Sequence, residues 1–175
     1  MNQIEILSRQ TLDAYTWTDK LINSVAYDKW DDIPAVIETS VTWQVGHLIV
    51  SLYYHSIMVI VGHQKDILET MPMREYDRLF TNSYPKKAMG KTIPGALRSN
   101  LTIMQKRSID VIDSLRTEDL DCALHSTEVQ HPIAETKFDA LDWNIKHTMW
   151  HCGQLGILVR IAGERFDFGL RREPS

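Results

Sequence analysis

The chain lacks several features that would assign a protein to a class at once. Its two cysteines, Cys122 and Cys152, are too few for a disulfide scaffold in 175 residues. A net charge of -4 at pH 7 offers no cationic surface to nucleic acid or anionic lipid. The opening MNQIEILSRQ lacks the basic and apolar runs of a signal peptide. We therefore expect a cytoplasmic protein with no nucleic-acid partner and no membrane partner.

Uninterrupted apolar runs and strand-like alternation are also scarce. The longest apolar stretch, VGHLIVSLYYHSIMVIVG, is broken by His47, Ser51, His55 and Ser56, so it predicts a buried helix rather than a membrane span. Apolar residues make up 43% of the chain and charged residues 24%, as is usual for a globular protein. The length predicts a single domain over residues 1–175.

Helical periodicity dominates the chain. Apolar residues at steps of three and four, with capping signals, predict four long helices at about 3–25, 40–61, 92–116 and 139–162. For the third helix we expect Thr92 as the N-cap and Pro94 in the first turn, and for the fourth Asp139 as the N-cap and Gly163 as the stop. The intervening connections are long: MREYDRLF predicts a short helix, TNSYPKKAMGK predicts a loop, and residues 117–137 predict a loop with at most one short turn of helix. This pattern indicates an all-α helical bundle.

Two histidines lie one turn apart in the fourth predicted helix. At about 100° per residue, His147, His151, Gln154 and Leu158 point to the same side. Since Leu158 belongs on the buried side, the two imidazoles should face the interior, where such a pair can bind one metal ion. Position 148 is Thr, so the HExxH pattern of zinc proteases does not apply.

A third ligand must come from another helix, and His47 is the best candidate. It shares a side of the second predicted helix with Trp43, Val50, Ser51, Tyr54 and Met58. Of the remaining histidines, we expect His55 beside the site and His63 on the surface. His125 and His131 belong to an irregular segment; we expect them to be exposed in loops, with folding of that segment over the site as the alternative. The alternative is that the three inward histidines bind no metal and are satisfied in the core by Tyr54, Asn144, Ser51 or buried water.

Two motifs resemble the DinB-like superfamily of small bacterial four-helix proteins. They are TWQVGHL, which contains His47, and HTMWHCGQLGILVRIAG, which contains His147 and His151. The resemblance implies a four-helix bundle of DinB-like type with long inter-helix connections, and a zinc or nickel ion held by His47, His147 and His151 with one coordination position open. Members often carry Arg where this chain has Cys152, which should point away from the pair and not be a ligand.

The resemblance also implies an activity. Relatives include thiol-dependent transferases, which use thiols such as bacillithiol or mycothiol, and a maleylpyruvate isomerase. A thiol-dependent S-transferase acting on a small molecule is therefore the first hypothesis, with a metal-dependent hydrolase or a non-catalytic metal-binding or interaction module as alternatives. The resemblance and the apolar residues of the first and third helices suggest a homodimer.

Further side chains are assigned to the surroundings of the predicted metal. We expect a pocket lined by Trp43, Tyr54, Trp143 and Trp150, with Ser51 nearby. Gln154 is expected to hydrogen-bond a ligand histidine or a metal-bound water, with a buried glutamine bonded to the backbone as the alternative. The C-terminal ERFDFGLRREPS is expected to be a partly packed tail.

Overall fold

Helices account for the architecture of the chain. The computed structural model describes residues 2–128, 130–163 and 166–167, and across them it contains helices, turns and no strand beyond an isolated bridge between Ala123 and Thr136. The predicted all-α class is confirmed. Most of the expected tail lies outside the described residues.

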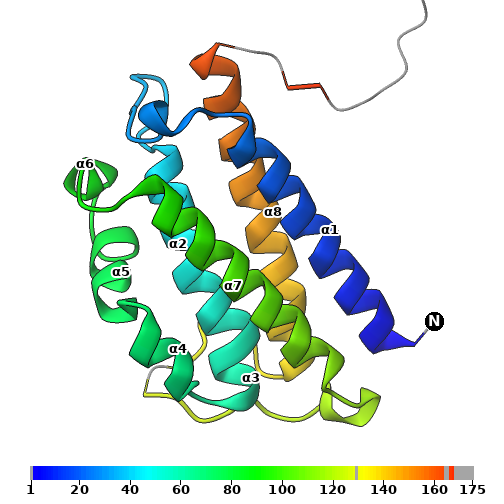
Figure 1. Ribbon diagram of the computed structural model, residues 1–175. Coiled ribbons are helices and arrows are strands. Elements are labelled where there is room, and N and C mark those ends of the chain that lie inside the picture. Colours follow the sequence, from blue (N-terminus) through cyan, green and yellow to red (C-terminus); the bar gives the residue numbers. More distant parts are fainter. Residues whose placement is uncertain (1, 129, 164–165, 168–175) are drawn as a thin grey trace, which may run out of the picture.

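Four long helical segments lie side by side (Figure 1). They are α1 (Gln3–Asn23), α2 (Val41–Tyr53) with its continuation, α7 (Pro94–Asp113) and α8 (Lys137–Ala162). The continuation of α2 is a π-helical turn, η2 (Tyr54–Met58), followed by α3 (Val59–Val61). Helix α1 packs against α8 and α7, and α2 packs against α7 and α8, so the first and last helices of the chain become neighbours.

Shorter helices fill the connections. Between α3 and α7 lie α4 (Lys65–Thr70), α5 (Met73–Phe80) and α6 (Pro85–Ala88), while the 3-10 turns η1 (Tyr27–Lys29) and η3 (Thr117–Asp119) occupy two other links. Helix α5 is the one predicted from MREYDRLF, and it packs against α2. Helix α6 corrects the expectation of a loop at TNSYPKKAMGK, because Pro85 fixes a helical φ at its first position. The fold therefore has more helices than a minimal four-helix bundle.

Two predicted helix starts are wrong by a few residues. The N-cap of α8 is Thr136, whose side chain accepts a hydrogen bond from the Asp139 amide, while Asp139 returns a bond to the cap backbone. Asp139 is thus the third helical residue of a capping box rather than the cap. Helix α7 begins at Pro94 after Ile93, which makes no side-chain cap, so Thr92 does not cap it. Gly163, with φ of 131°, ends α8 as predicted.

The core forms where the long helices face one another. It is built mainly from aliphatic side chains of α2, α7 and α8, among them Leu48, Ile49, Leu97, Leu101, Met104, Ile112 and Leu155. The segment Val41–Val61 is long and apolar enough to cross a membrane by length and composition, yet 72% of its most apolar window is buried within the fold. That burial is characteristic of the core helix of a soluble protein.

Candidate metal centre

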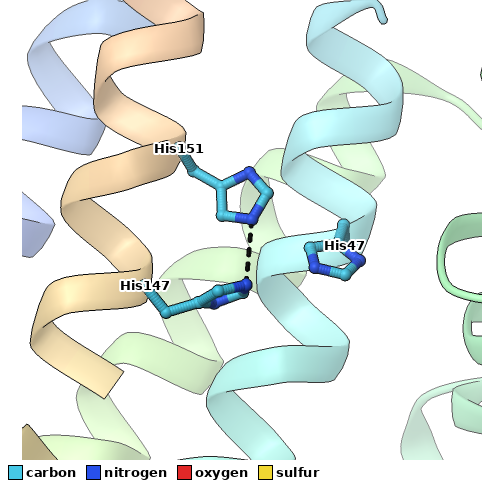
Figure 2. A group of neighbouring side chains, drawn as sticks. All are labelled: His47, His147 and His151. Carbon is cyan, nitrogen blue, oxygen red and sulfur yellow. Dashed lines mark hydrogen bonds between the residues drawn. The ribbon is translucent and has the colours of Figure 1, made fainter. Parts of the chain in front are cut away.

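Three histidines from two helices converge at one place. His47 projects from α2 towards His147 and His151 of α8 (Figure 2). One ring nitrogen from each lies within 4.8 Å of the others. The helical phases predicted this meeting, because each histidine lies on the side of its helix that faces the partner helix.

Two of the three rings are fixed by oxygen acceptors at Nδ1. His47 Nδ1 lies 2.8 Å from the carbonyl oxygen of Phe80, to which it donates. His151 Nδ1 donates to Oε1 of Gln44. With its proton on Nδ1, a neutral imidazole carries its lone pair on Nε2, which is the usual arrangement of a metal-binding histidine.

Gln44 is itself held in one orientation. Its amide nitrogen donates to Thr39 Oγ1 at 2.9 Å and to Oε1 of Gln154, so its oxygen must face His151. Gln154 therefore acts on His151 through Gln44, and among the described residues it makes no direct hydrogen bond to a triad histidine. Neither Gln44 nor Phe80 was predicted; Gln44 lies on the buried side of α2 three residues before His47, which was the available signal.

A close approach of α5 to α2 places the Phe80 carbonyl. A Cβ built on Gly46 would lie 2.3 Å from the Phe80 ring, a distance that van der Waals contact forbids. Only glycine at this position lets the fully buried Phe80 ring pack here. The glycine immediately before His47 is thus part of how the ligand is oriented.

Burial keeps the three imidazoles neutral. Burial and the neighbouring histidines lower the pKa of His151 to about 2 and that of His147 to about 4, and burial lowers the pKa of His47. Neutral imidazoles have lone pairs available for a metal at physiological pH.

The donor set fits a divalent ion. Nε2 of His147 and Nε2 of His151 lie 3.1 Å apart, and a proton or a cation must lie between two such lone pairs. In addition, His147 Nδ1 is buried and has no hydrogen-bond partner among the described residues. Three imidazole nitrogens are ligands that zinc and nickel accept, and they leave a coordination position open.

Two of the partners considered for core histidines that bind no metal, Asn144 and Ser51, make no hydrogen bond to the triad among the described residues. Asn144 donates to Tyr15 at 3.0 Å instead of to a histidine. Ser51 is buried in α2, and no hydrogen bond joins it to the triad within the described part of the chain. The Phe80 carbonyl and Gln44 orient His47 and His151 through Nδ1, so neither group occupies Nε2 of the ring that it holds.

Tryptophans flank two of the three rings. Trp43 stacks on His47 with ring centroids 4.9 Å apart, and its Nε1 donates to the Ser83 carbonyl at 3.3 Å. Trp143 stacks on His147 at 6.0 Å. Trp150 is 62% exposed and contacts Trp143 edge-on rather than a histidine. Of the predicted aromatic lining, Trp43 and Trp143 reach the triad.

Cys152 lies on another side of α8. Its Sγ is 3.2 Å from Thr18 Oγ1 of α1, and burial raises the pKa of its thiol. The residue is absent from the group of possible ligands. Its position and its protonated thiol agree with the prediction that it is not a metal ligand.

Two further histidines lie beside the triad. His55 is buried in η2, and its ring centroid is 5.5 Å from that of His147. His131, expected to be an exposed loop residue, is only 6% exposed and is hydrogen-bonded to His55 at 2.8 Å, because the segment before α8 folds back against η2. Tyr54 stacks on His131 rather than on a triad ring. His63 and His125 are exposed, as predicted.

Comparison with known families agrees with the motifs. The model of the DinB superfamily matches residues 10–155, a range that contains His47, His147 and His151. No curated protein matches the chain.

Proposed function

The chain belongs to the DinB superfamily, and from this premise we propose that it binds one divalent ion, zinc or nickel, through His47, His147 and His151. The observation that carries the proposal is the convergence of one nitrogen from each histidine within 4.8 Å. The acceptors at His47 and His151 aim Nε2 of each ring into the cluster. The four long helices would then form the four-helix bundle of DinB-like type that carries the ion.

We propose further that the protein is a thiol-dependent S-transferase for a small molecule. A bound ion would supply positive charge that lowers the pKa of a thiol placed beside it. No carboxylate hydrogen-bonds to a triad histidine in the described ranges, and a thiol is the substrate that least needs such a base. The indole rings of Trp43 and Trp143, which stack on His47 and His147, would offer apolar surface to an electrophile.

Metal content tests the first step. Untagged wild-type protein, incubated with zinc or nickel and desalted, should contain about one ion per chain by plasma mass spectrometry. His47→Ala and His151→Ala should lose it, while His63→Ala, which removes an exposed histidine, should retain it. An empty wild-type protein would refute the metal site.

Thiol binding tests the second step. Bacillithiol added to cobalt-loaded protein should produce the near-ultraviolet absorption of a thiolate bound to cobalt. An apolar alkyl halide should then react with the thiolate sulfur, lose its halide ion and yield a thioether detected by mass spectrometry. Cobalt loading without thiol binding would leave a non-catalytic metal-binding protein or a hydrolase and would reject the transferase.

The setting of this activity is proposed as well. We propose a cytoplasmic protein, folded as one domain over residues 1–175 and paired as a homodimer. Leu12 of α1 is 56% exposed and Ile103 of α7 is 52% exposed, and such side chains are suited to a subunit contact. Sedimentation of wild type beside Leu12→Lys tests the dimer.

A further inference from the structure

Backbone amides dictate where the proton of His131 lies. Its Nδ1 is 2.9 Å from the amide nitrogen of Ala134 and 3.3 Å from that of Ile133. An amide N–H can only donate, so Nδ1 of His131 must accept. Neutral His131 therefore carries its proton on Nε2.

That proton fixes the tautomer of His55. Nε2 of His131 lies 2.8 Å from Nδ1 of His55, so His131 donates and His55 accepts. Neutral His55 then carries its own proton on Nε2. Both rings are buried, and Tyr54 stacks on His131 at 5.3 Å with the planes 5° apart, which holds the pair in place.

His55 carries its proton on Nε2, whereas two of the triad rings carry theirs on Nδ1. His47 and His151 donate through Nδ1 to oxygens and keep Nε2 as a lone pair, whereas His55 keeps an N–H at Nε2. The His55 ring packs edge-on against His147, with centroids 5.5 Å apart and planes at 68°. Nε2 of His55 makes no hydrogen bond to any residue that the structure describes. Within the described part of the chain, the N–H of His55 thus lacks an acceptor while its ring packs against His147, one of the three candidate ligands.

The same bonds prevent His55 from serving as a fourth ligand. Coordination through Nε2 would move its proton to Nδ1, where it would face the proton on Nε2 of His131. The amides of Ile133 and Ala134 prevent His131 from reversing in turn. The pair is suited to donating a hydrogen bond and unsuited to binding a cation.

We propose that His131 and His55 form an oriented pair that presents the Nε2–H of His55 to an anion seated at the triad, with a thiolate or a small inorganic monoanion as the ligand class. His55 binds the anion, and His131 is the positioning residue that sets its tautomer. The inference rests on the proposed metal site. It adds to that site an explanation of why two more histidines are buried beside it.

The tautomers can be tested without metal. Nitrogen-15 NMR of metal-free protein should show protons on Nε2 of His55 and His131 and on Nδ1 of His47 and His151. A proton on Nδ1 of His55 would overturn the proposal. The readout does not depend on any activity.

Azide binding to cobalt-loaded protein tests the role. Loss of a hydrogen bond to a charged group should weaken azide binding by about 10-fold or more in His55→Phe. His55→Gln, which keeps an N–H donor, should recover part of the loss. Cobalt affinity should change by less than about 3-fold in both variants, and His125→Ala, which removes an exposed histidine, should match wild type in both measurements.

The outcomes separate the two proposals. Cobalt binding with unchanged azide affinity in His55→Phe would overturn the hydrogen-bond role and leave the metal site standing. Failure of wild-type protein to bind cobalt would reject the metal site, and the anion role with it. His131→Phe should also weaken azide binding, because without His131 the proton of His55 is no longer confined to Nε2.

Discussion

Gln44 holds more of the site together than its neighbour Gln154 does. Its oxygen accepts from His151, and its nitrogen bonds Thr39 and Gln154. Gln44→Ala should leave His151 Nδ1–H without an acceptor and weaken metal binding by about 10- to 100-fold. Gln154→Ala should have a smaller effect, since it removes only one of the two bonds that orient Gln44. Competitive titration against a chromogenic chelator would measure both, and equal affinities in Gln44→Ala and wild type would contradict this role.

The buried histidines make the metal-free protein sensitive to acid. The folded-state pKa values of His55, His147 and His151 fall to about 3, about 4 and about 2, from an ordinary value of 6.5. Above pH 6.5 both the folded and the unfolded state are neutral at these residues. Below it, only the unfolded state takes up protons, so the free energy of unfolding should drop by up to about 1.4 kcal/mol per pH unit for each histidine.

Denaturant titrations between pH 7.5 and 4.5 would measure this loss. His151→Asn should flatten the profile, because it removes one of the three groups. His125→Ala, which removes an exposed histidine outside this buried group, should keep the wild-type slope. A wild-type stability independent of pH over this range would contradict the burial of neutral imidazoles.

At the scale of residues, the sequence predicts those contacts that follow from helix phase. His47, His147 and His151 could be assigned because spacing alone places each on an inward side. Phe80 could not, because its contribution is a main-chain carbonyl brought in by a separate helix. His131 could not either, since it precedes α8 in a segment without periodicity, and its burial depends on how that segment folds back.

The contact between α5 and α2 depends on a missing side chain. Gly46→Ala would place a Cβ 2.3 Å from the buried Phe80 ring. The substitution should therefore lower the free energy of unfolding by about 1–3 kcal/mol or more. It should also weaken metal binding, because displacing Phe80 moves the oxygen that holds His47. Gly156→Ala is the matched control: no atom lies within 4 Å of its added Cβ, and a helix-interior alanine should stabilise the fold by about 0.5–1 kcal/mol.

Thermal unfolding with and without zinc would measure both Gly46 effects. A Gly46→Ala protein as stable as Gly156→Ala would show that α5 can shift without cost. Normal stability with weakened zinc binding would instead place the effect in the carbonyl alone.

At the scale of elements, the long helices follow from periodicity and the turn η2 does not. Ideal α geometry places His55 about 80° from His47 around the axis, at the edge of the inward side. The π turn over Tyr54–Met58 changes the helical phase at His55. No pattern in the local sequence predicts this turn. The start of α8 shows a different difficulty: Thr136 and Asp139 are both good N-caps, and only their reciprocal bonds decide between them.

The triad joins parts of the whole molecule that are distant in the chain. Since α2 and α8 each contribute ligands, metal should stabilise the folded state against the unfolded one. Free zinc at 1,000 times its dissociation constant should add about 4 kcal/mol, which raises Tm by roughly 8–16 °C at this chain length. Calorimetry should show this rise, its reversal by a chelator, and its absence in His47→Ala; an equal rise in that variant would indicate zinc binding elsewhere.

Trp43 stacks on His47 and Trp143 stacks on His147, so the fluorescence of these two tryptophans should report on the state of the centre. Indole emission is quenched by a protonated imidazole or an open-shell ion in contact with the ring, but not by a closed-shell ion. Nickel or cobalt should therefore quench the fluorescence of these two tryptophans, whereas zinc should leave it unchanged. Acid should quench it in the absence of metal. Trp30, buried elsewhere and bonded to the Val25 carbonyl, provides a steady background. Trp43→Phe and Trp143→Phe would divide the signal between α2 and α8, so that occupancy of the centre can be followed in real time from each helix separately.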